Sequence, residues 1–318
     1  MFREGPRRAT LADVFAREDR ERAQKTLRDA HGRMSATVFK TGVDMDSFGA
    51  SPGNTVEADK RTVEECKKRF ASDEQRLSPR ERAEHREAKF AADVFEGVVY
   101  DEVNESGWLG EGVVAVRTTP YDDIVNGVDI VIEMTDPSGG RRHLALAVDV
   151  SFGEWAVPNK FRRILEEIDR GEAAKIKYYE SAGTKETLRN VPRTVVGVER
   201  GVVEELADLW LEKETHRVKK EKLRTHPIQH MILKQVVEQL EVYEAYALRG
   251  EHPTQGQRNV AAFCQKARLV LQKMLEEKSS LPLGMFRGDR VCEQIDRSLK
   301  MTKARIARSA SEGKESQE

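Results

Sequence analysis

The chain has few cysteines, few aromatic residues and no long apolar run. Its three cysteines, Cys66, Cys264 and Cys292, lie far apart, without a CxxC pair or a His/Cys metal-binding spacing. We therefore expect neither a disulfide framework nor a zinc site, and this cysteine usage fits a reducing, cytoplasmic location. No apolar run approaches ~18 residues, so no membrane-spanning helix is expected. The start, MFREGPRR, also lacks the apolar segment of a signal peptide.

A strong overall charge is absent too, because the formal net charge is −1, and bulk charge therefore predicts no partner. Local charge is different. Residues 1–40 carry ten Lys/Arg against six Asp/Glu, and residues 285–309 carry seven against three. The segment HRVKKEKLR (216–224) is a dense basic cluster. Such clusters either contact phosphate or form solvated helix faces, and both interpretations stay open.

Apolar residues make up 38% and charged residues 34%, which predicts one packed domain with partly buried charged helices around it. The pattern changes along the chain and suggests four segments. These are charged helices and a linker (1–77), an α/β core (78–212), a helical region (213–308) and a tail that is disordered by composition (309–318).

The expected core has the order αβββαβ and begins at a helix with Ser78 as N-cap, Pro79 at its first position and Glu81 three residues after the cap. Periodicity and turn residues give the rest. Helices are expected over 8–38, 58–71, 79–104, 157–171, 201–220, 227–249, 256–278 and 288–308. Strands are expected over 113–119, 127–134, 143–152, 174–181 and 193–199.

Two of these strands contain an aspartate in an apolar setting, in GVDIVIEM (127–134) and HLALAVDVSF (143–152). The even-numbered positions of both strands are large and apolar. A hairpin that matches these faces puts Asp129 and Asp149 on the other face, opposite each other or nearly so. Two carboxylates that close repel each other unless a cation intervenes, and hard divalent cations prefer oxygen ligands. Each aspartate could also be structural by itself.

A third carboxylate can join this pair from the preceding helix. Glu96 follows Phe95 on the apolar stripe of helix 79–104, so it is expected at or beside the sheet. Asp122 and Asp123, in the sequence YDD, precede Asp129 by a short loop. One of them could add a ligand, or could hold the loop through an Asx-type turn.

These residues and their order resemble the PD-(D/E)XK nuclease superfamily, over roughly residues 80–212. The resemblance rests on Glu96 in FEGVVYDEV, Asp129 in PYDDIVNGVD and Asp149 in AVDVS. It implies a restriction-endonuclease-like αβββαβ core with a mixed sheet, flanked by helical additions. It also implies metal-dependent hydrolysis of nucleic acid, DNA in the first instance, with Mg²⁺ or Mn²⁺ held by Asp129, Asp149 and Glu96.

One position departs from the family pattern. Where the family places a lysine, this chain has Ser151, which carries no charge to stabilise a transition state. The best substitute is Lys160, in the first turn of the next expected helix, whose stem could lie along the sheet. Lys175 and Lys177 are weaker candidates.

Two other functions remain open. A catalytically inactive member of the same fold would bind nucleic acid or protein, and the missing lysine favours that alternative. A scaffold protein could instead assemble through the apolar stripes of helices 227–249 and 256–278, although such stripes are more often domain core. The sequence leaves oligomer formation undecided.

Overall fold

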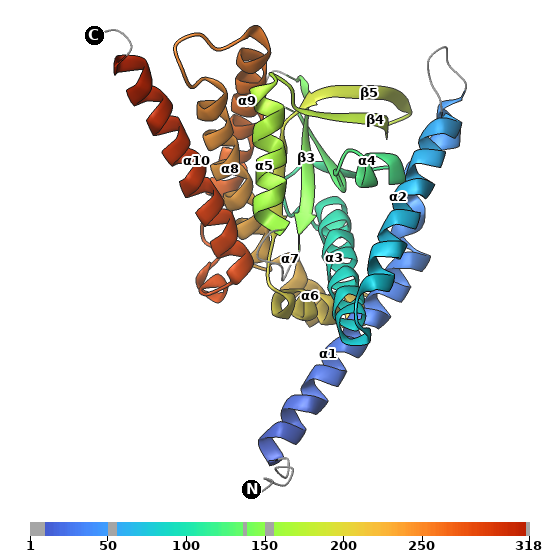
Figure 1. Cartoon of the computed structure of the whole chain (residues 1–318). Coiled ribbons are helices and arrows are strands. Elements are labelled where there is room, and N and C mark those ends of the chain that lie inside the picture. The colour runs from blue at the N-terminus through green and yellow to red at the C-terminus, as the bar shows by residue number, and fades with distance from the viewer. Residues whose placement is uncertain (1–9, 50–55, 136–138, 150–155, 316–318) are drawn as a thin grey trace, which may run out of the picture.

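The computed structural model describes residues 10–49, 56–135, 139–149 and 156–315, and it shows a mixed α/β protein rich in helix (Figure 1). Long helices surround a small twisted sheet, and the first described helix begins on a different side of the molecule from where the last one ends (Figure 1). No helix within these ranges combines the length and the apolar character that crossing a bilayer requires.

The N-terminal third is helical, as the sequence predicts. It contains α1 (Leu11–Ala36), the 3₁₀ turns η1 (Val38–Thr41) and η2 (Met45–Phe48), α2 (Val56–Arg76) and α3 (Pro79–Ser106). The predicted start of α3 is confirmed, since the Ser78 hydroxyl accepts from the Glu81 backbone N–H and the Glu81 carboxylate accepts from the Ser78 N–H. Helix α2 runs five residues further than predicted, to Arg76.

A four-stranded sheet forms the centre, in the order β1-β2-β3-β6. Its strands are β1 (Val114–Arg117), β2 (Ile130–Thr135), β3 (Arg141–Asp149) and β6 (Arg193–Gly197). The pairs β1–β2 and β2–β3 are antiparallel, and β3–β6 is parallel, so the sheet is mixed. The predicted hairpin is confirmed: Ile130 pairs with Leu146 and Ile132 with Leu144, which matches even positions with even positions.

The two faces of the sheet lie in different apolar clusters. Ile130, Ile132 and Met134 are fully buried in the main core, together with Phe95 and Val99 of α3. On the other face, Val131 belongs to a second cluster that it shares with the hairpin β4 (Ala174–Ser181) and β5 (Thr184–Val191). The hairpin therefore covers the face on which Asp129 was expected.

Two elements were missed from the sequence. Strand β5, with the sequence TKETLRNV, is mostly polar and exposed, so it lacks the apolar alternation that predicts a strand. The turn between β4 and β5 was not predicted either. It is formed by Ala182 and Gly183, which have φ values of 48° and 77°. The short helix α4 (Pro120–Ile124) is capped by the Thr119 side chain, which accepts from the Asp122 N–H.

The helices that follow the sheet pack against the same core. They are α5 (Ala156–Asp169), α6 (Arg200–Glu212), α7 (Arg217–Arg224), α8 (Ile228–Ala247), α9 (Gln255–Glu277), the 3₁₀ turn η3 (Gly284–Phe286) and α10 (Arg290–Glu315). One buried cluster runs from Leu27 of α1 to Leu299 of α10, so both terminal regions contribute to it. The predicted helix 201–220 is divided between α6 and α7. Helix α10 extends to Glu315, into the stretch whose composition predicts disorder.

Candidate functional site: an acidic group between α3, α4 and β2

Asp122 is a structural residue of the YDD loop. Its side chain is fully buried, and its two carboxylate oxygens accept hydrogen bonds from four donors. The donors are the Thr119 hydroxyl (3.1 Å), the Asn126 amide (2.6 Å) and the backbone N–H groups of Lys177 (2.7 Å) and Tyr178 (2.9 Å). Asp122 thereby ties α4 to β4. The two oxygens of a carboxylate offer about four acceptor sites, and these four donors use them, which leaves none for a ligand.

Asp123, the next residue, instead faces two other carboxylates. Burial, followed by the charges of Asp129 and Glu96 and a hydrogen bond with Asp129, raises the pKa of Asp123 to about 8. Asp123 is exposed, so solvent weakens the effect of burial on this pKa, and the two neighbouring carboxylates are its main physical cause. Of the two uses that the sequence left open, Asp122 has the structural one, and a ligand role for Asp123 stays a prediction.

Glu96 completes the group from α3. Its side chain is 13% exposed, and burial together with the charge of Asp129 raises the pKa of Glu96 to about 7. Glu96, Asp123 and Asp129 therefore form an acidic group that is supplied by α3, α4 and the residue just before β2. At neutral pH, such a group favours bound protons or a bound cation.

Arg117, at the end of β1, is the cation next to this group. Its Nε and Nη2 lie 2.9 and 2.6 Å from the same oxygen, Oε1 of Glu96. The guanidinium also lies 4.3 Å from the ring centroid of Phe39, in a cation–π contact. The charge of Arg117 lowers the pKa of both Glu96 and Asp123, although this effect is smaller than the effects that raise them. Arg117 was not predicted as a site residue, because strand periodicity gives no reason to pair it with Glu96.

Two further arginines surround the loop before β2. The Arg163 Nη2 of α5 donates to the Val125 carbonyl at 3.0 Å, and a Cβ atom on Gly127 would lie 2.8 Å from Arg163 Nη1. Gly127 has a φ of 66°, and this backbone conformation favours glycine there. Arg193, 6% exposed, pairs with Glu167 at 3.1 Å. Burial lowers the pKa of Arg193, against the charges of Glu167 and Asp129.

The remaining predicted site residues are only partly placed. The structure describes the backbone of Asp149, which pairs with Gly197 at the end of β3, but not its side chain. The β2–β3 register, continued by one residue, puts Asp129 opposite Ala147. Asp149 is therefore two residues along β3 from the position opposite Asp129. Ser151 lies outside the described residues. Lys160 is half-buried in α5, and its proposed role stays a prediction.

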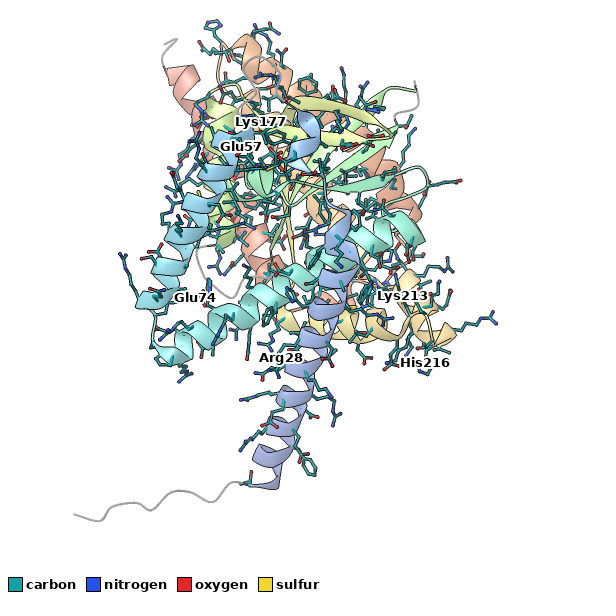
Figure 2. The ribbon with its side chains drawn as sticks, turned by 90° about the vertical axis from the view of Figure 1, so that its right-hand side faces the viewer. Arg28, Glu57, Glu74, Lys177, Lys213 and His216 are labelled. Carbon is teal, nitrogen blue, oxygen red and sulfur yellow. The ribbon has the colours of Figure 1, made fainter. Side chains whose placement is uncertain are left out.

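The other two lysines considered from the sequence have different surroundings. Lys177 forms an ion pair with Asp59 of α2, and the hydroxyl of Tyr178 donates to the same carboxylate oxygen at 2.5 Å. Figure 2 shows Lys177 beside α2, near Glu57. This contact joins α2 to β4 and explains why an aspartate that is 7% exposed is tolerated there. Lys175 is exposed on β4.

A more compact acidic group lies elsewhere. Among the described residues, Asp101, Glu102 and Glu105 of α3 are the only His, Cys, Asp or Glu trio whose ligand atoms all lie within 4.8 Å of one another. The Lys213 ammonium lies 2.6, 2.9 and 2.8 Å from these three carboxylates, and the Trp210 indole donates to Asp101 at 2.5 Å. A cation of the protein itself therefore occupies this group, which excludes it as our metal candidate.

The pKa shifts in that group follow from its composition. Burial alone lowers the pKa of Lys213, but hydrogen bonds with Asp101 and Glu105 and the charge of Glu102 raise it overall. Burial also raises the pKa of Glu102, which is 1% exposed, in spite of the ammonium. The pKa values of both Lys213 and Glu102 are raised, because one cation shared by three acids does not offset the burial of Glu102. Figure 2 shows that Lys213 lies far from Lys177.

Comparison with known proteins adds no assignment, because no family model, curated protein or solved structure matches this chain.

Proposed function

We propose that the protein is a metal-dependent nuclease that hydrolyses phosphodiester bonds of nucleic acid, DNA in the first instance. The observation that carries this proposal is the convergence of Glu96, Asp123 and Asp129 from three separate elements. Carboxylate pKa values that burial and neighbouring carboxylates raise together are typical of sites that bind a cation or transfer protons. The element order α3-β1-β2-β3-α5-β6 and the mixed sheet support the PD-(D/E)XK resemblance, and we propose the restriction-endonuclease-like core on that basis.

The donor set fits Mg²⁺ or Mn²⁺. Carboxylate oxygens are the ligands that these hard cations prefer. A cation would relieve the repulsion that, after burial, raises the pKa values of Asp123 and Glu96. Glu96, Asp123 and Asp129 would hold the ion, with Asp149 as the further ligand that the family pattern implies. A bound ion would supply Lewis-acid activation of the phosphodiester and of the attacking water.

Arg117 has a separate role in this proposal. In the structure, Arg117 donates two hydrogen bonds to one oxygen of Glu96. It thereby orients that carboxylate and offsets part of the negative charge. A fixed guanidinium beside the acids can also stabilise charge that develops on a phosphate. Arg117 thus offers a positive charge at a site where the family lysine is replaced by Ser151, and Lys160 remains the other candidate.

The test is nicking of supercoiled plasmid DNA by the full chain with Mg²⁺ or Mn²⁺. We expect cleavage that EDTA abolishes and that Asp129→Asn and Asp149→Asn reduce by about 100-fold or more. Asp29→Asn, at an exposed position of α1, is the matched control and should cleave like the wild type. Absence of metal-dependent cleavage, or equal cleavage by Asp129→Asn and Asp29→Asn, would contradict the proposal.

One observation favours the alternative of an inactive, nucleic-acid-binding member of the same fold. The Arg117 guanidinium donates two hydrogen bonds to Glu96, so this acid already has a cation partner. On this alternative, the chain binds DNA in EDTA and Arg117→Met does not create or abolish cleavage. If the wild type cleaves DNA and Arg117→Met changes the rate of cleavage, the protein is an enzyme and this alternative is wrong.

A further inference from the structure

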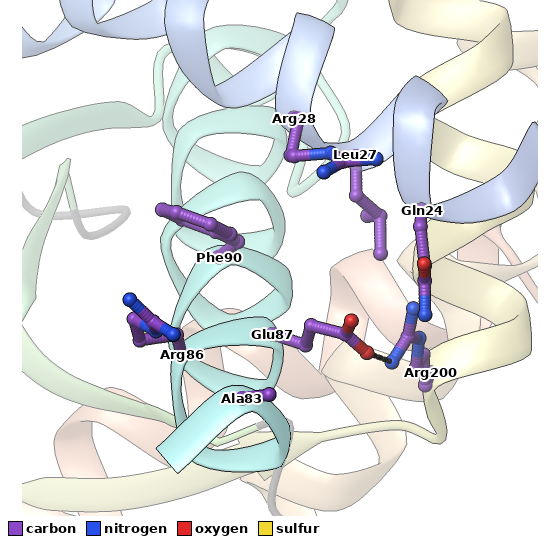
Figure 3. A pocket seen from close by; sticks show the side chains of 8 residues that line it. All are labelled: Gln24, Leu27, Arg28, Ala83, Arg86, Glu87, Phe90 and Arg200. Carbon is purple, nitrogen blue, oxygen red and sulfur yellow. Dashed lines mark hydrogen bonds and ion pairs between the residues drawn. The ribbon is translucent and has the colours of Figure 1, made fainter. Parts of the chain in front are cut away.

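A pocket of about 380 Å³ lies between α1, α3 and the start of α6, away from the acidic group. Its walls are Gln24, Leu27 and Arg28 of α1, Ala83, Arg86, Glu87 and Phe90 of α3, and Arg200 of α6. Figure 3 shows the side chains of the three helices arranged around this space. The volume is within the range of small-molecule sites, ~300–1,000 Å³.

The pocket has an excess of positive charge. Arg200 is compensated, since its guanidinium contacts Glu87 at 2.8 Å and Glu204 at 2.6 Å (Figure 3 shows the Glu87 contact). Arg28 and Arg86 are exposed, and neither has an ion pair or side-chain hydrogen bond with another residue that the structure describes. Two guanidinium groups without partners, one on each side of a pocket, are suited to an anion with several acceptor oxygens.

The rest of the lining consists of Leu27, Ala83 and Phe90, which are apolar, and the polar Gln24. Leu27 is 2% exposed, and Phe90 packs against the His31 ring with centroids 4.7 Å apart. A ligand that combines an anionic group with a planar ring matches this combination better than a bare anion does. Nucleotides have this combination, because a phosphate is attached to a base that can stack on aromatic and arginine side chains.

The pocket and the acidic group share one helix, α3, which supplies both Phe90 and Glu96. His31 Nε2 lies 3.1 Å from Asp93, whose pKa is raised by burial against the charges of His31, Lys89 and Arg117. Phe90 and Glu96 are six residues apart on α3, which is roughly 9 Å along the axis.

We infer that this pocket binds the phosphate of a nucleotide, with Arg28 and Arg86 on the phosphate and Phe90 and Leu27 against the nucleoside. The nucleotide is either free or the end of a nucleic-acid strand. The inference deepens the proposed nuclease function by giving it a phosphate subsite, and that connection rests on the proposed function. Binding itself is independent of catalysis, so it is measured in EDTA, where failure of cleavage has no influence on the result.

The experiment measures binding of three probes to the full chain by titration calorimetry. The probes are AMP, a twelve-nucleotide single strand with a 5′-phosphate, and the same strand without it. We expect Arg28→Gln/Arg86→Gln to weaken binding by about tenfold or more. The matched control, Arg22→Gln/Arg69→Gln, removes two exposed arginines outside the pocket and should change binding by less than about threefold. Ala83→Trp fills the pocket without a change of charge and should also weaken binding.

Each outcome decides the inference. Binding of AMP that the pocket variants weaken assigns a free nucleotide, and binding of the 5′-phosphorylated strand alone assigns a strand end. The inference is overturned if the wild type binds none of the probes, or if the pocket and control double variants weaken binding equally. It is also overturned if Ala83→Trp, folded by circular dichroism, binds as the wild type does.

Discussion

Gln239 of α8 and Val195 of β6 are joined by two hydrogen bonds that imitate a neighbouring strand. The Val195 N–H donates to Gln239 Oε1 at 2.8 Å, and Gln239 Nε2 donates to the Val195 carbonyl at 2.7 Å. One helical turn earlier, Gln235 makes the same pair of contacts with Gly197, at 3.1 and 2.9 Å. These glutamines satisfy the open edge of the sheet, which an unpaired strand would otherwise leave as buried polar groups.

Replacement of Gln239 by leucine should therefore destabilise the fold. Gln239→Leu leaves the N–H and carbonyl of Val195 buried without a partner, and we expect the free energy of unfolding to fall by about 2 kcal/mol. Urea denaturation followed by circular dichroism measures this loss. Gln265→Leu, at an exposed position of α9, is the control and should change the value by less than ~0.5 kcal/mol. Equal stability of the two variants would show that the glutamine contacts contribute nothing.

The adjacent residues Asp122 and Asp123 should respond in opposite directions to alanine. Asp122→Ala removes the acceptor of four hydrogen bonds at a fully buried position, and we expect a loss of about 3 kcal/mol. Asp123→Ala relieves repulsion from Asp129 and Glu96, so stability at neutral pH should stay the same or rise. Denaturation midpoints of the two variants at one pH provide the comparison. A larger loss for Asp123→Ala would contradict the assignment of roles.

Stability should depend on pH through the acidic group. The pKa values of Glu96 and Asp123 are about 7 and about 8 in the folded chain, above their ordinary values of 4.5 and 3.8. Between these limits the folded state binds more protons than the unfolded state, so the two groups make the free energy of unfolding fall as pH rises from ~4 to ~8. Glu96→Gln and Asp123→Asn remove this dependence.

The measurement is the melting temperature of Asp123→Asn and wild type at two pH values. We expect the variant to be more stable by about 1 kcal/mol near pH 8.5, a small value because solvent screens the exposed side, and unchanged near pH 4. Asp29→Asn should show no such difference. Added Mg²⁺ should stabilise the wild type at the higher pH by mass action, and Asp129→Asn less. A benefit of Asp123→Asn that is equal at both pH values would exclude the charge explanation.

Lys213 should be among the most sensitive side chains in the molecule. Lys213→Met leaves Asp101, Glu102 and Glu105 without their common cation, and we expect a loss of about 3 kcal/mol near pH 8. The loss should shrink as the pH falls toward 5, because protonation removes the repulsion among the acids. Lys219→Met, in the more exposed pair with Asp208, is the control and should cost about 0.5 kcal/mol. An equal loss for both lysines would show that burial of the ion pairs is irrelevant.

The sequence predicted best those features that depend on neighbouring residues. The capping box at Ser78 and Glu81 was predicted correctly because both partners lie within one helical turn. The even register of β2 and β3 followed from side-chain alternation, because a slip of one residue would expose Ile130 and Ile132. Strand β5 escaped prediction because its polar side chains face solvent and its pairing with β4 is decided by the turn.

Electrostatic partners were the least predictable features. Periodicity pointed to Glu96 beside the sheet, but Arg117 is separated from it by 21 residues and no local pattern connects them. The sequence offered two uses for the YDD pair without assigning either. The assignment depends on the N–H groups of Lys177 and Tyr178, which a strand 55 and 56 residues further along brings to Asp122.

By itself, the sequence determined the mixed α/β class, most of the helices and strands, and the face-matching of the central hairpin, because these follow from the spacing of apolar residues and from capping groups. Only the tertiary structure decided which charges meet. It placed Asp123 with Glu96 and Asp129, gave Asp101, Glu102 and Glu105 to Lys213, and closed the sheet edge with Gln235 and Gln239. These pairings depend on packing between distant segments, and charge–charge energies depend on the distances and burial that packing sets.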